Sequence, residues 1–160
     1  MEKITTIKPN RIIIDCPAGI DGGFRRAVES ASEHIVVTTP HLSAVRDAGK
    51  TILHLKNLLE TSPYVVINRA RGDLILGGEM LSISAISEFL ASPLIGVVPE
   101  DDEIARQNYF GGLINEQSFA MQAIQMIADN ILIGQNKIFD CTKKYKGVIG
   151  RIRKALRKRV

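Results

Sequence analysis

Asp15 is the residue whose surroundings point most clearly to chemistry, because it directly follows the apolar run Ile12-Ile13-Ile14. If this run is a strand of a parallel sheet, the carboxylate lies at the carboxyl edge of the sheet, where such sheets bind their ligands. In phosphoryl-transfer enzymes an acid at that edge holds the magnesium ion, usually through water. Asp15 is therefore a candidate catalytic and magnesium-binding residue; the alternative is an acid that only caps the next turn.

The residues behind Asp15 form a second chemical signal. Pro17 and Gly19 give a rigid turn with one conformationally permissive position, and a loop of this kind can sense a terminal phosphate. The sequence contains no G-x-x-x-x-G-K-[ST] motif, however, and residues 1–10 contain no glycine. We therefore expect that hydrolysis of ATP needs a lysine-bearing loop from elsewhere.

Short apolar runs alternate with segments of helical length, and these elements must position the candidate residues. Runs without polar alternation are predicted as strands buried on both faces, at residues 11–15, 35–38, 64–68 and 94–98. Apolar residues spaced by three and four predict helices at residues 23–32, 43–60, 82–91 and 118–133. This order predicts an α/β fold with a mostly parallel sheet and helices on both faces.

Composition is that of one globular domain with a core, since 45% of the 160 residues are hydrophobic and 24% are charged. The two cysteines and three histidines show neither disulfide-framework nor metal-ligand spacing. No apolar run approaches the roughly 20 residues that a membrane-spanning helix needs. We expect a body at residues 1–133, a linker at 134–142 and a separate tail at 143–160.

Charge is divided sharply between the tail and the rest of the chain. Residues 141–160 contain nine lysines and arginines and no acid, whereas the other 140 residues carry a net charge of −5. Apolar residues spaced by three and four in the tail predict an amphipathic helix that lies in an anionic membrane surface. The predicted membrane-contacting residues are Tyr145, Val148, Ile149, Ile152 and Leu156, with Lys143, Lys144, Arg151, Arg153, Lys154, Arg157 and Lys158. The alternatives are a basic helix that binds nucleic acid or a calmodulin-like partner, and a solvated helix packed on the body.

Six short motifs then occur in one order along most of the chain. The first is Asp15-Cys16-Pro17-Ala18-Gly19, and the others lie at residues 36–40, 43–47, 66–69, 79–82 and 96–101. In this order and register the chain resembles the bacterial MinD family, which belongs to the MinD/ParA group of deviant Walker P-loop ATPases. The resemblance implies a P-loop NTPase fold of the MinD/ParA type that lacks its phosphate-binding loop.

The resemblance also implies a nucleotide site for ATP and Mg²⁺. Asp15 would be the Walker B acid, and Pro17 and Gly19 would belong to the nucleotide-sensing loop. The residues that match the family's adenine pocket are Asn68, Arg69, Pro99, Glu100 and Asp101. The plainer alternatives are a strand-terminal cap for Asn68 and a helix-opening turn at Pro99.

Partners and location are implied in the same way. In the family, the helix face that matches Ser43, Arg46 and Asp47 receives MinC and MinE, although Gly49 departs from the acid expected there. The resemblance further implies ATP-dependent homodimers that bind the inner face of the bacterial cell membrane and position the division septum. Two other functions remain open: a membrane-attached interaction module without enzymatic activity, and a ParA-like or flagellar-number regulator whose basic tail binds DNA.

Overall fold

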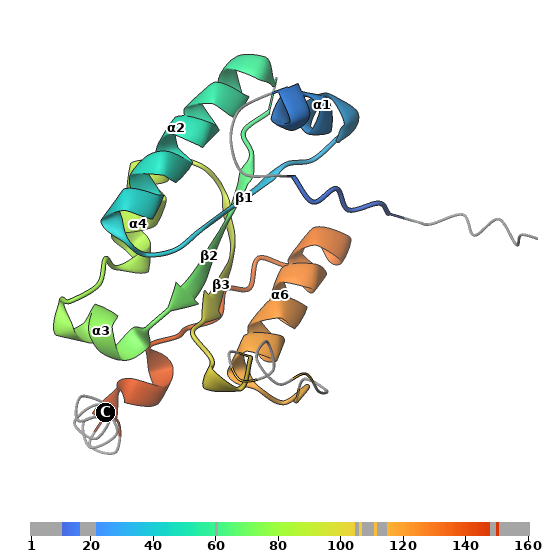
Figure 1. Ribbon diagram of the computed structural model, residues 1–160. Coiled ribbons are helices and arrows are strands. Elements are labelled where there is room, and N and C mark those ends of the chain that lie inside the picture. The colour runs from blue at the N-terminus through green and yellow to red at the C-terminus, as the bar shows by residue number, and fades with distance from the viewer. Residues whose placement is uncertain are drawn as a thin grey trace, which may run out of the picture. The chain divides into compact units, whose positions relative to one another are not determined.

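The computed structural model describes residues 11–16, 22–59, 61–104, 106, 111, 115–147 and 150 of the chain. The chain divides into two compact units, Met1–His34 and Ile35–Val160. The predicted parallel sheet lies in the second unit, whose elements are labelled in Figure 1.

The first unit contains the helix α1 (Gly22–Ser30), which buries Phe24 and Val28. Residues 11–16 have no regular secondary structure, and the side chains of Ile12 and Ile13 are 79% and 94% exposed. The prediction of a buried strand at residues 11–15 is therefore wrong. A strand needs a hydrogen-bonding neighbour, and the sheet of the described residues consists of three other segments.

Three of the predicted strands form the sheet of the second unit: β1 (Ile35–Thr38), β2 (Tyr64–Ala70) and β3 (Leu94–Pro99). The strands are parallel and lie in the order β1-β2-β3, so that each follows its neighbour through a helical crossover. The predicted mostly parallel sheet is confirmed.

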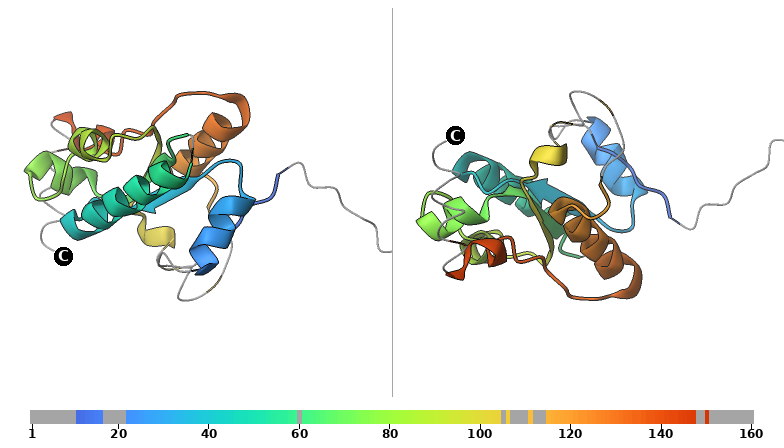
Figure 2. Two further views of the ribbon diagram at one scale, coloured as in Figure 1. Left: turned by 90° about the horizontal axis from the view of Figure 1, so that it is seen from above. Right: turned by 90° about the horizontal axis from the view of Figure 1, so that it is seen from below.

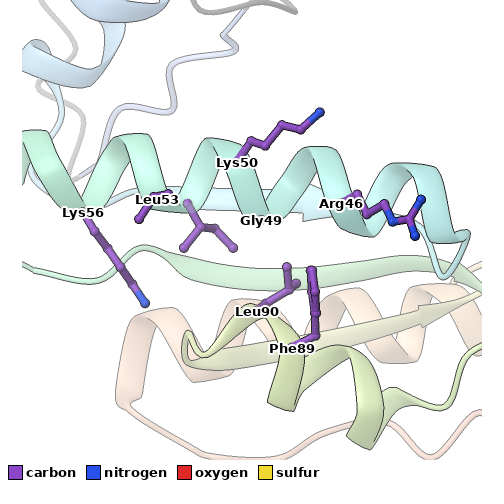
Figure 3. A pocket seen from close by; sticks show the side chains of 8 residues that line it. Arg46, Gly49, Lys50, Leu53, Lys56, Phe89 and Leu90 are labelled. Atoms are coloured by element: carbon purple, nitrogen blue, oxygen red, sulfur yellow. The ribbon is translucent and has the colours of Figure 1, made fainter.

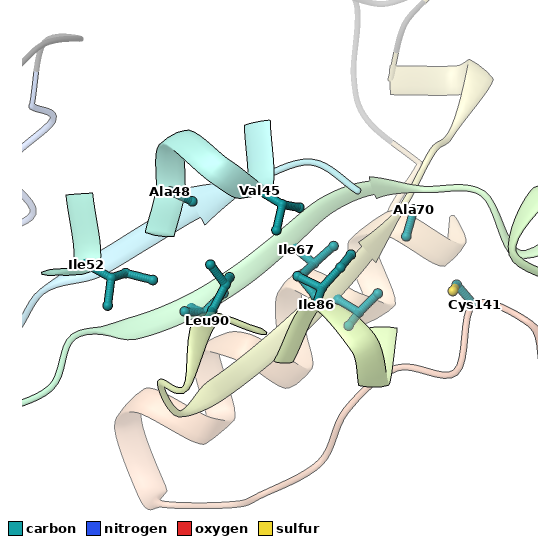
Figure 4. Packing of buried hydrophobic residues seen from close by; sticks show 10 residues of the cluster. Val45, Ala48, Ile52, Ile67, Ala70, Ile86, Leu90 and Cys141 are labelled. Atoms are coloured by element: carbon teal, nitrogen blue, oxygen red, sulfur yellow. The ribbon is translucent and has the colours of Figure 1, made fainter. Parts of the chain in front are cut away.

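One face of the sheet is covered by α2 (Leu42–Leu58) and α4 (Ile83–Leu90), as Figure 1 shows. The Ser82 hydroxyl accepts a hydrogen bond from the Ala85 amide at 3.1 Å and starts α4. Side chains spaced by three and four along α2 fill the core against β2, β3 and α4 (Figure 4); the buried cluster is Val45, Ala48, Ile52, Val65, Ile67, Ala70, Ile86, Leu90, Val97 and Cys141.

The opposite face is covered by α6 (Phe119–Ile133), as Figure 2 shows. The helix packs on β3, and its Ala120 and Ala123 are buried in a cluster with Val66 and Val98. Gly96 permits the close approach, because a Cβ there would lie 2.1 Å from Ile127 Cγ1. Helices on both faces are thus confirmed. Phe119, which the spacing would place in the packing stripe, is half-exposed, and the buried stripe begins one residue later.

Two short elements lie beyond the carboxyl end of β2. The helix α3 (Gly72–Gly77) follows β2 directly, and the 3₁₀ turn η1 (Lys143–Tyr145) packs against it. At six residues α3 is too short to produce a helical pattern in the sequence. Within the described part of the chain, no helix is long and apolar enough to cross a membrane.

Candidate functional site

The carboxyl ends of β2 and β3 lie side by side and define one edge, which we call the β2–β3 edge. Ala70 is paired with Pro99, and the Glu100 amide donates a hydrogen bond to the Ala70 carbonyl at 3.1 Å. This pairing places side by side the two segments that carry the predicted adenine-pocket residues, which are Asn68 and Arg69 on one and Pro99, Glu100 and Asp101 on the other. Ligands of parallel sheets bind at such an edge.

Arg69 has an unusual backbone, with a φ of 59° at an irregularity in the pairing of β2 with β3. A non-glycine residue in this region costs about 1–2 kcal/mol and persists only where the surroundings hold it. Here the Asn68 Oδ1 accepts from the Arg69 amide at 2.8 Å, and the Arg69 guanidinium bonds Glu100 Oε1 at 2.9 Å. Strain of this kind concentrates at functional sites.

A second arginine, Arg71, stabilises the β2–β3 edge through contacts with Asp73 and Glu100. The Arg71 guanidinium donates to both carboxylate oxygens of Asp73, at 2.7 and 3.3 Å, and lies 3.9 Å from Glu100 Oε2. Asp73 is only 2% exposed, and its hydrogen bond with Arg71 raises the pKa of that arginine. Glu100 therefore lies between two guanidinium groups. The only sequence signal for this pair was an arginine and an acid two residues apart.

The other two polar residues at the edge differ in their roles: the Asp101 side chain is used by the fold, and the Asn68 side chain can still donate a hydrogen bond. One Asp101 oxygen accepts from the Glu103 amide at 3.0 Å, and the other accepts from the Ala120 amide at 3.4 Å. This carboxylate therefore caps a turn and anchors α6. The Asn68 side-chain nitrogen has no partner among the described residues and remains available as a hydrogen-bond donor.

The predicted magnesium ligand lies in the first unit of the chain, whereas the β2–β3 edge belongs to the second. Asp15 is exposed and belongs to the first unit, and Pro17 and Gly19 lie outside the described residues. The predicted position of Asp15 at the carboxyl edge of a strand is not realised, since residues 11–16 form no strand. Over the described ranges, no group of three or more His, Cys, Asp or Glu side chains could hold a metal ion.

The residues Gly49-Lys50-Thr51 match the last three positions of a phosphate-binding loop, although they are not among the site residues predicted from the sequence. It lies inside α2, where the backbone amides are used by the helix. The Lys50 ammonium is 3.1 Å from Asp47 Oδ1, and the Thr51 hydroxyl donates to the Asp47 carbonyl. This run therefore forms no phosphate cradle.

The predicted partner face lies on the first turns of α2, where Ser43, Arg46 and Asp47 are all exposed. Arg46 also lines a groove of about 470 Å³ between α2 and α4, which we call the α2–α4 groove (Figure 3). The structure thus places these three side chains where a partner could reach them.

The start of the tail differs from the prediction. Lys143–Tyr145 is a 3₁₀ turn, Lys146 is extended and Gly147 has a φ of 81°. Tyr145 is buried at 6% exposure, and Lys144 Nζ lies 4.9 Å from the centroid of the Phe119 ring. Tyr145 and Lys144 are thus held by the body rather than exposed on an amphipathic helix, because aromatic packing offers them partners there. Of the other predicted membrane residues, Lys143 is exposed, and Val148, Ile149, Arg151, Ile152, Arg153, Lys154, Leu156, Arg157 and Lys158 lie outside the described residues.

Asp140 holds this turn in place, and we call residues 140–146 the tail root. The Asp140 Oδ1 accepts a hydrogen bond from the Thr142 amide at 2.9 Å and another from the Thr142 hydroxyl, and the Asp140 Oδ2 lies 2.9 Å from Lys146 Nζ. The hydroxyl of Thr142, with the charge of Lys146, lowers the pKa of Asp140 to about 2, against the opposing effect of burial. The predicted linker therefore ends in a fixed turn.

Replacing Thr142 with valine should raise the pKa of Asp140 toward its ordinary value of 3.8, because the strongest donor to the carboxylate is lost. A depressed pKa adds stability that is full above pH 3.8 and disappears as the pH falls to about 2. The variant should lose under about 1 kcal/mol at neutral pH, since the carboxylate is half-exposed, and should match the parent near pH 2. Titration of the Asp140 carboxyl by NMR and unfolding at both pH values measure this.

Thr51→Val is the matched control, because the Thr51 hydroxyl donates to a backbone carbonyl and to no carboxylate. It should leave the dependence of stability on pH unchanged. An unaltered Asp140 titration in the Thr142 variant would show that the hydroxyl is not the cause.

Known proteins with similar sequences indicate the family that this chain resembles. No protein-family model matches the chain. The chain is 40% identical over 153 residues to the septum site-determining protein MinD of Synechocystis, covering 91% of this chain and 56% of the relative. It is 37% identical over 146 residues to MinD of Bacillus subtilis, covering 89% and 54%. The chain thus spans about half the length of these curated relatives.

Solved structures agree with this result. The MinD cell division protein of Aquifex aeolicus matches with a TM-score of 0.69 and 31% identity, over 78% of this chain and 53% of that chain. The same organism's MinC:MinD complex matches with a TM-score of 0.68 and 32% identity, over 76% and 50%. MinD of Pyrococcus horikoshii, solved with Mg-ADP, matches with a TM-score of 0.61 and 26% identity, over 74% and 49%.

The parallel sheet, its helices and these structural neighbours define a P-loop α/β protein of the MinD/ParA class. Within that class, the chain is MinD-like: it is similar to septum site-determining MinD proteins over about half of their length.

Proposed function

We propose that this chain acts in the selection of the division site as a MinD-type component. In this function it binds the inner face of the bacterial membrane through its basic tail and recruits MinC and MinE through α2. It also binds the base of ATP at the β2–β3 edge without hydrolysing the nucleotide on its own. The observation that carries the proposal is the edge itself, where a MinD-type sheet places side by side the two segments that carry the predicted pocket residues.

The described residues fit the base end of a nucleotide better than its phosphate end. The Asn68 side-chain nitrogen has no partner among the residues that the structure describes and lies beside the strained backbone of Arg69, which suits recognition of a base by hydrogen bonds. A single carboxylate such as Asp15 is compatible with Mg²⁺, which is bound largely by phosphates and water. A bound nucleotide with Mg²⁺ would control dimerisation. The described residues of this chain would contact the base of that nucleotide.

Among the described residues, no loop forms a cradle for the phosphates. The sequence has no complete phosphate-binding motif, and its Gly-Lys-Thr run is part of α2. Independent ATPase activity is therefore not part of the proposed function. The relatives support the assignment of MinC as a partner, because one matching structure is a MinC:MinD complex, and the assignment of a nucleotide with Mg²⁺, because another is MinD with Mg-ADP.

The proposed membrane attachment predicts that a chain ending at Lys146 loses vesicle binding. The structure sets this cut, because Tyr145 belongs to the core and removing it would uncover apolar surface. The cut removes six basic residues, and each contributes about 1 kcal/mol near an anionic surface. Flotation with vesicles rich in phosphatidylglycerol should show a loss of at least about a hundredfold in affinity, and in the host cell the shortened chain should misplace the septum.

Vesicles of neutral lipid and a DNA duplex serve as controls for the source of the binding. Binding of the full chain should fall strongly on neutral vesicles. Equal binding by the full and shortened chains, or a preference for duplex DNA over anionic vesicles, would refute the membrane assignment.

A further inference from the structure

The α2–α4 groove combines an apolar floor with cations, and its described lining residues include no acid. Its lining residues are Arg46, Gly49, Lys50, Ile52, Leu53, Lys56, Phe89 and Leu90. Leu53 and Phe89 are 62% and 60% exposed, which is unusual for large apolar side chains that lie together. Glu88 precedes Phe89 in the chain but does not line the groove.

The two ends of the groove are marked by cations that remain available. The Lys56 ammonium donates to the Ala91 carbonyl at the end of α4 at 2.6 Å, which fixes its position and leaves its other two donors available. Arg46 lies at the opposite end and has no acidic partner within the described residues (Figure 3). Lys50 points away from α4 in Figure 3 and is paired with Asp47, so it contributes little.

Spacing along α2 sets the length of a matching ligand. Ten positions separate Arg46 from Lys56 in one continuous helix, which corresponds to about 15 Å. Gly49 lies between them, and a Cβ there would be 3.2 Å from the Phe89 ring, so the glycine keeps the floor of the groove low. An acid at position 49, as the resemblance would lead one to expect, would place a negative charge on this floor.

We propose that the α2–α4 groove binds an acidic amphipathic helix of a protein partner. The apolar side of that helix would lie on Leu53 and Phe89, and two carboxylates about ten residues apart would pair with Arg46 and Lys56. The proposal deepens the partner-binding part of the proposed function and rests on it, because it uses the same helix α2. It assigns the partner's chemistry through charge complementarity: an apolar stripe bounded by acids.

The test is the binding of a synthetic probe to the full chain. The probe is a labelled helical peptide of 16 residues with leucines spaced by three and four and glutamates at two positions ten residues apart. A matched probe carries lysine in place of both glutamates. Fluorescence anisotropy should show saturable binding of the acidic probe that weakens with salt, and at least about tenfold weaker binding of the basic probe.

Variants of the lining residues locate the site. The double variant Arg46→Glu, Lys56→Glu and the single variants Phe89→Ala and Gly49→Asp should each weaken the acidic probe by about tenfold or more. Lys50→Glu is the matched control and should change the affinity less than about twofold, because its side chain points away. Thermal melts of each variant show that the fold is kept.

Three outcomes would overturn the proposal. They are absence of binding by the acidic probe, equal binding of the two probes, and self-association of the chain that Phe89→Ala abolishes while neither probe binds. Vesicle binding by the same protein separates this proposal from the proposed function. If the full chain binds anionic vesicles but not the acidic probe, the groove assignment alone has failed.

Discussion

Replacing Arg71 with methionine should lower the free energy of unfolding by about 3–5 kcal/mol. The change keeps most of the side-chain volume but removes the two hydrogen bonds that Arg71 donates to Asp73, a carboxylate that is 2% exposed. Removing one partner of a buried ion pair destabilises a protein far more than replacing both partners with apolar residues, because the remaining charge stays buried. Urea denaturation followed by circular dichroism measures the loss.

Two further variants identify the cause. Lys50→Met breaks the exposed pair with Asp47 and should cost under about 0.5 kcal/mol. The double variant Arg71→Met, Asp73→Asn should recover part of the loss, since the two residues act as one unit. If Arg71→Met destabilises the chain no more than Lys50→Met, the buried pair does not stabilise the end of β2.

Replacing Gly72 with alanine should destabilise the second unit by about 2–3 kcal/mol, although alanine is the better helix former. A Cβ at this position would lie 2.1 Å from the Cys141 carbonyl oxygen and 2.7 Å from its carbon. These are backbone atoms that cannot rotate away, so the tail root would have to move off α3. Limited proteolysis should then cut within residues 140–146, and the melting temperature should fall.

Other glycines provide graded controls for this steric explanation. Gly22→Ala meets nothing within 4 Å and should change stability by less than about 0.5 kcal/mol. Gly96→Ala meets only the side chain of Ile127, which can change rotamer, and should fall between the two. A Gly72 variant as stable as the Gly22 variant would show that the root can shift without loss.

The sheet and its helices could be predicted because their signals are local. The apolar runs of β1, β2 and β3 and the three-and-four spacing of α2 and α4 are each visible within a few residues. The run at residues 11–15 carries the same signal but forms no strand, since a strand also depends on a neighbour that no local pattern reveals. Sequence therefore predicts the tendency to form a strand and not its pairing.

The site was predictable only in part for a related reason. Asn68 and Pro99 could be placed at strand ends, and the parallel sheet then brings those ends together. The Arg71 and Asp73 pair joins residues only two positions apart, but nothing in the sequence pattern shows that Asp73 is buried. The burial of Tyr145 depends on contacts between η1 and α3, segments about 70 residues apart in the chain, which have no periodic signature. The basic, periodic tail favoured one continuous helix, but aromatic contacts with the body hold its first residues in a turn.

The position of the tail root determines orientation as well as stability. The root packs against α3, which directly follows β2. The chain therefore leaves the body at the same end of the sheet that carries the β2–β3 edge. If the tail binds a membrane as proposed, that end of the sheet must face the bilayer. Copies bound to one membrane would then have the same orientation relative to the bilayer. They would meet one another only by diffusion within the plane of the membrane.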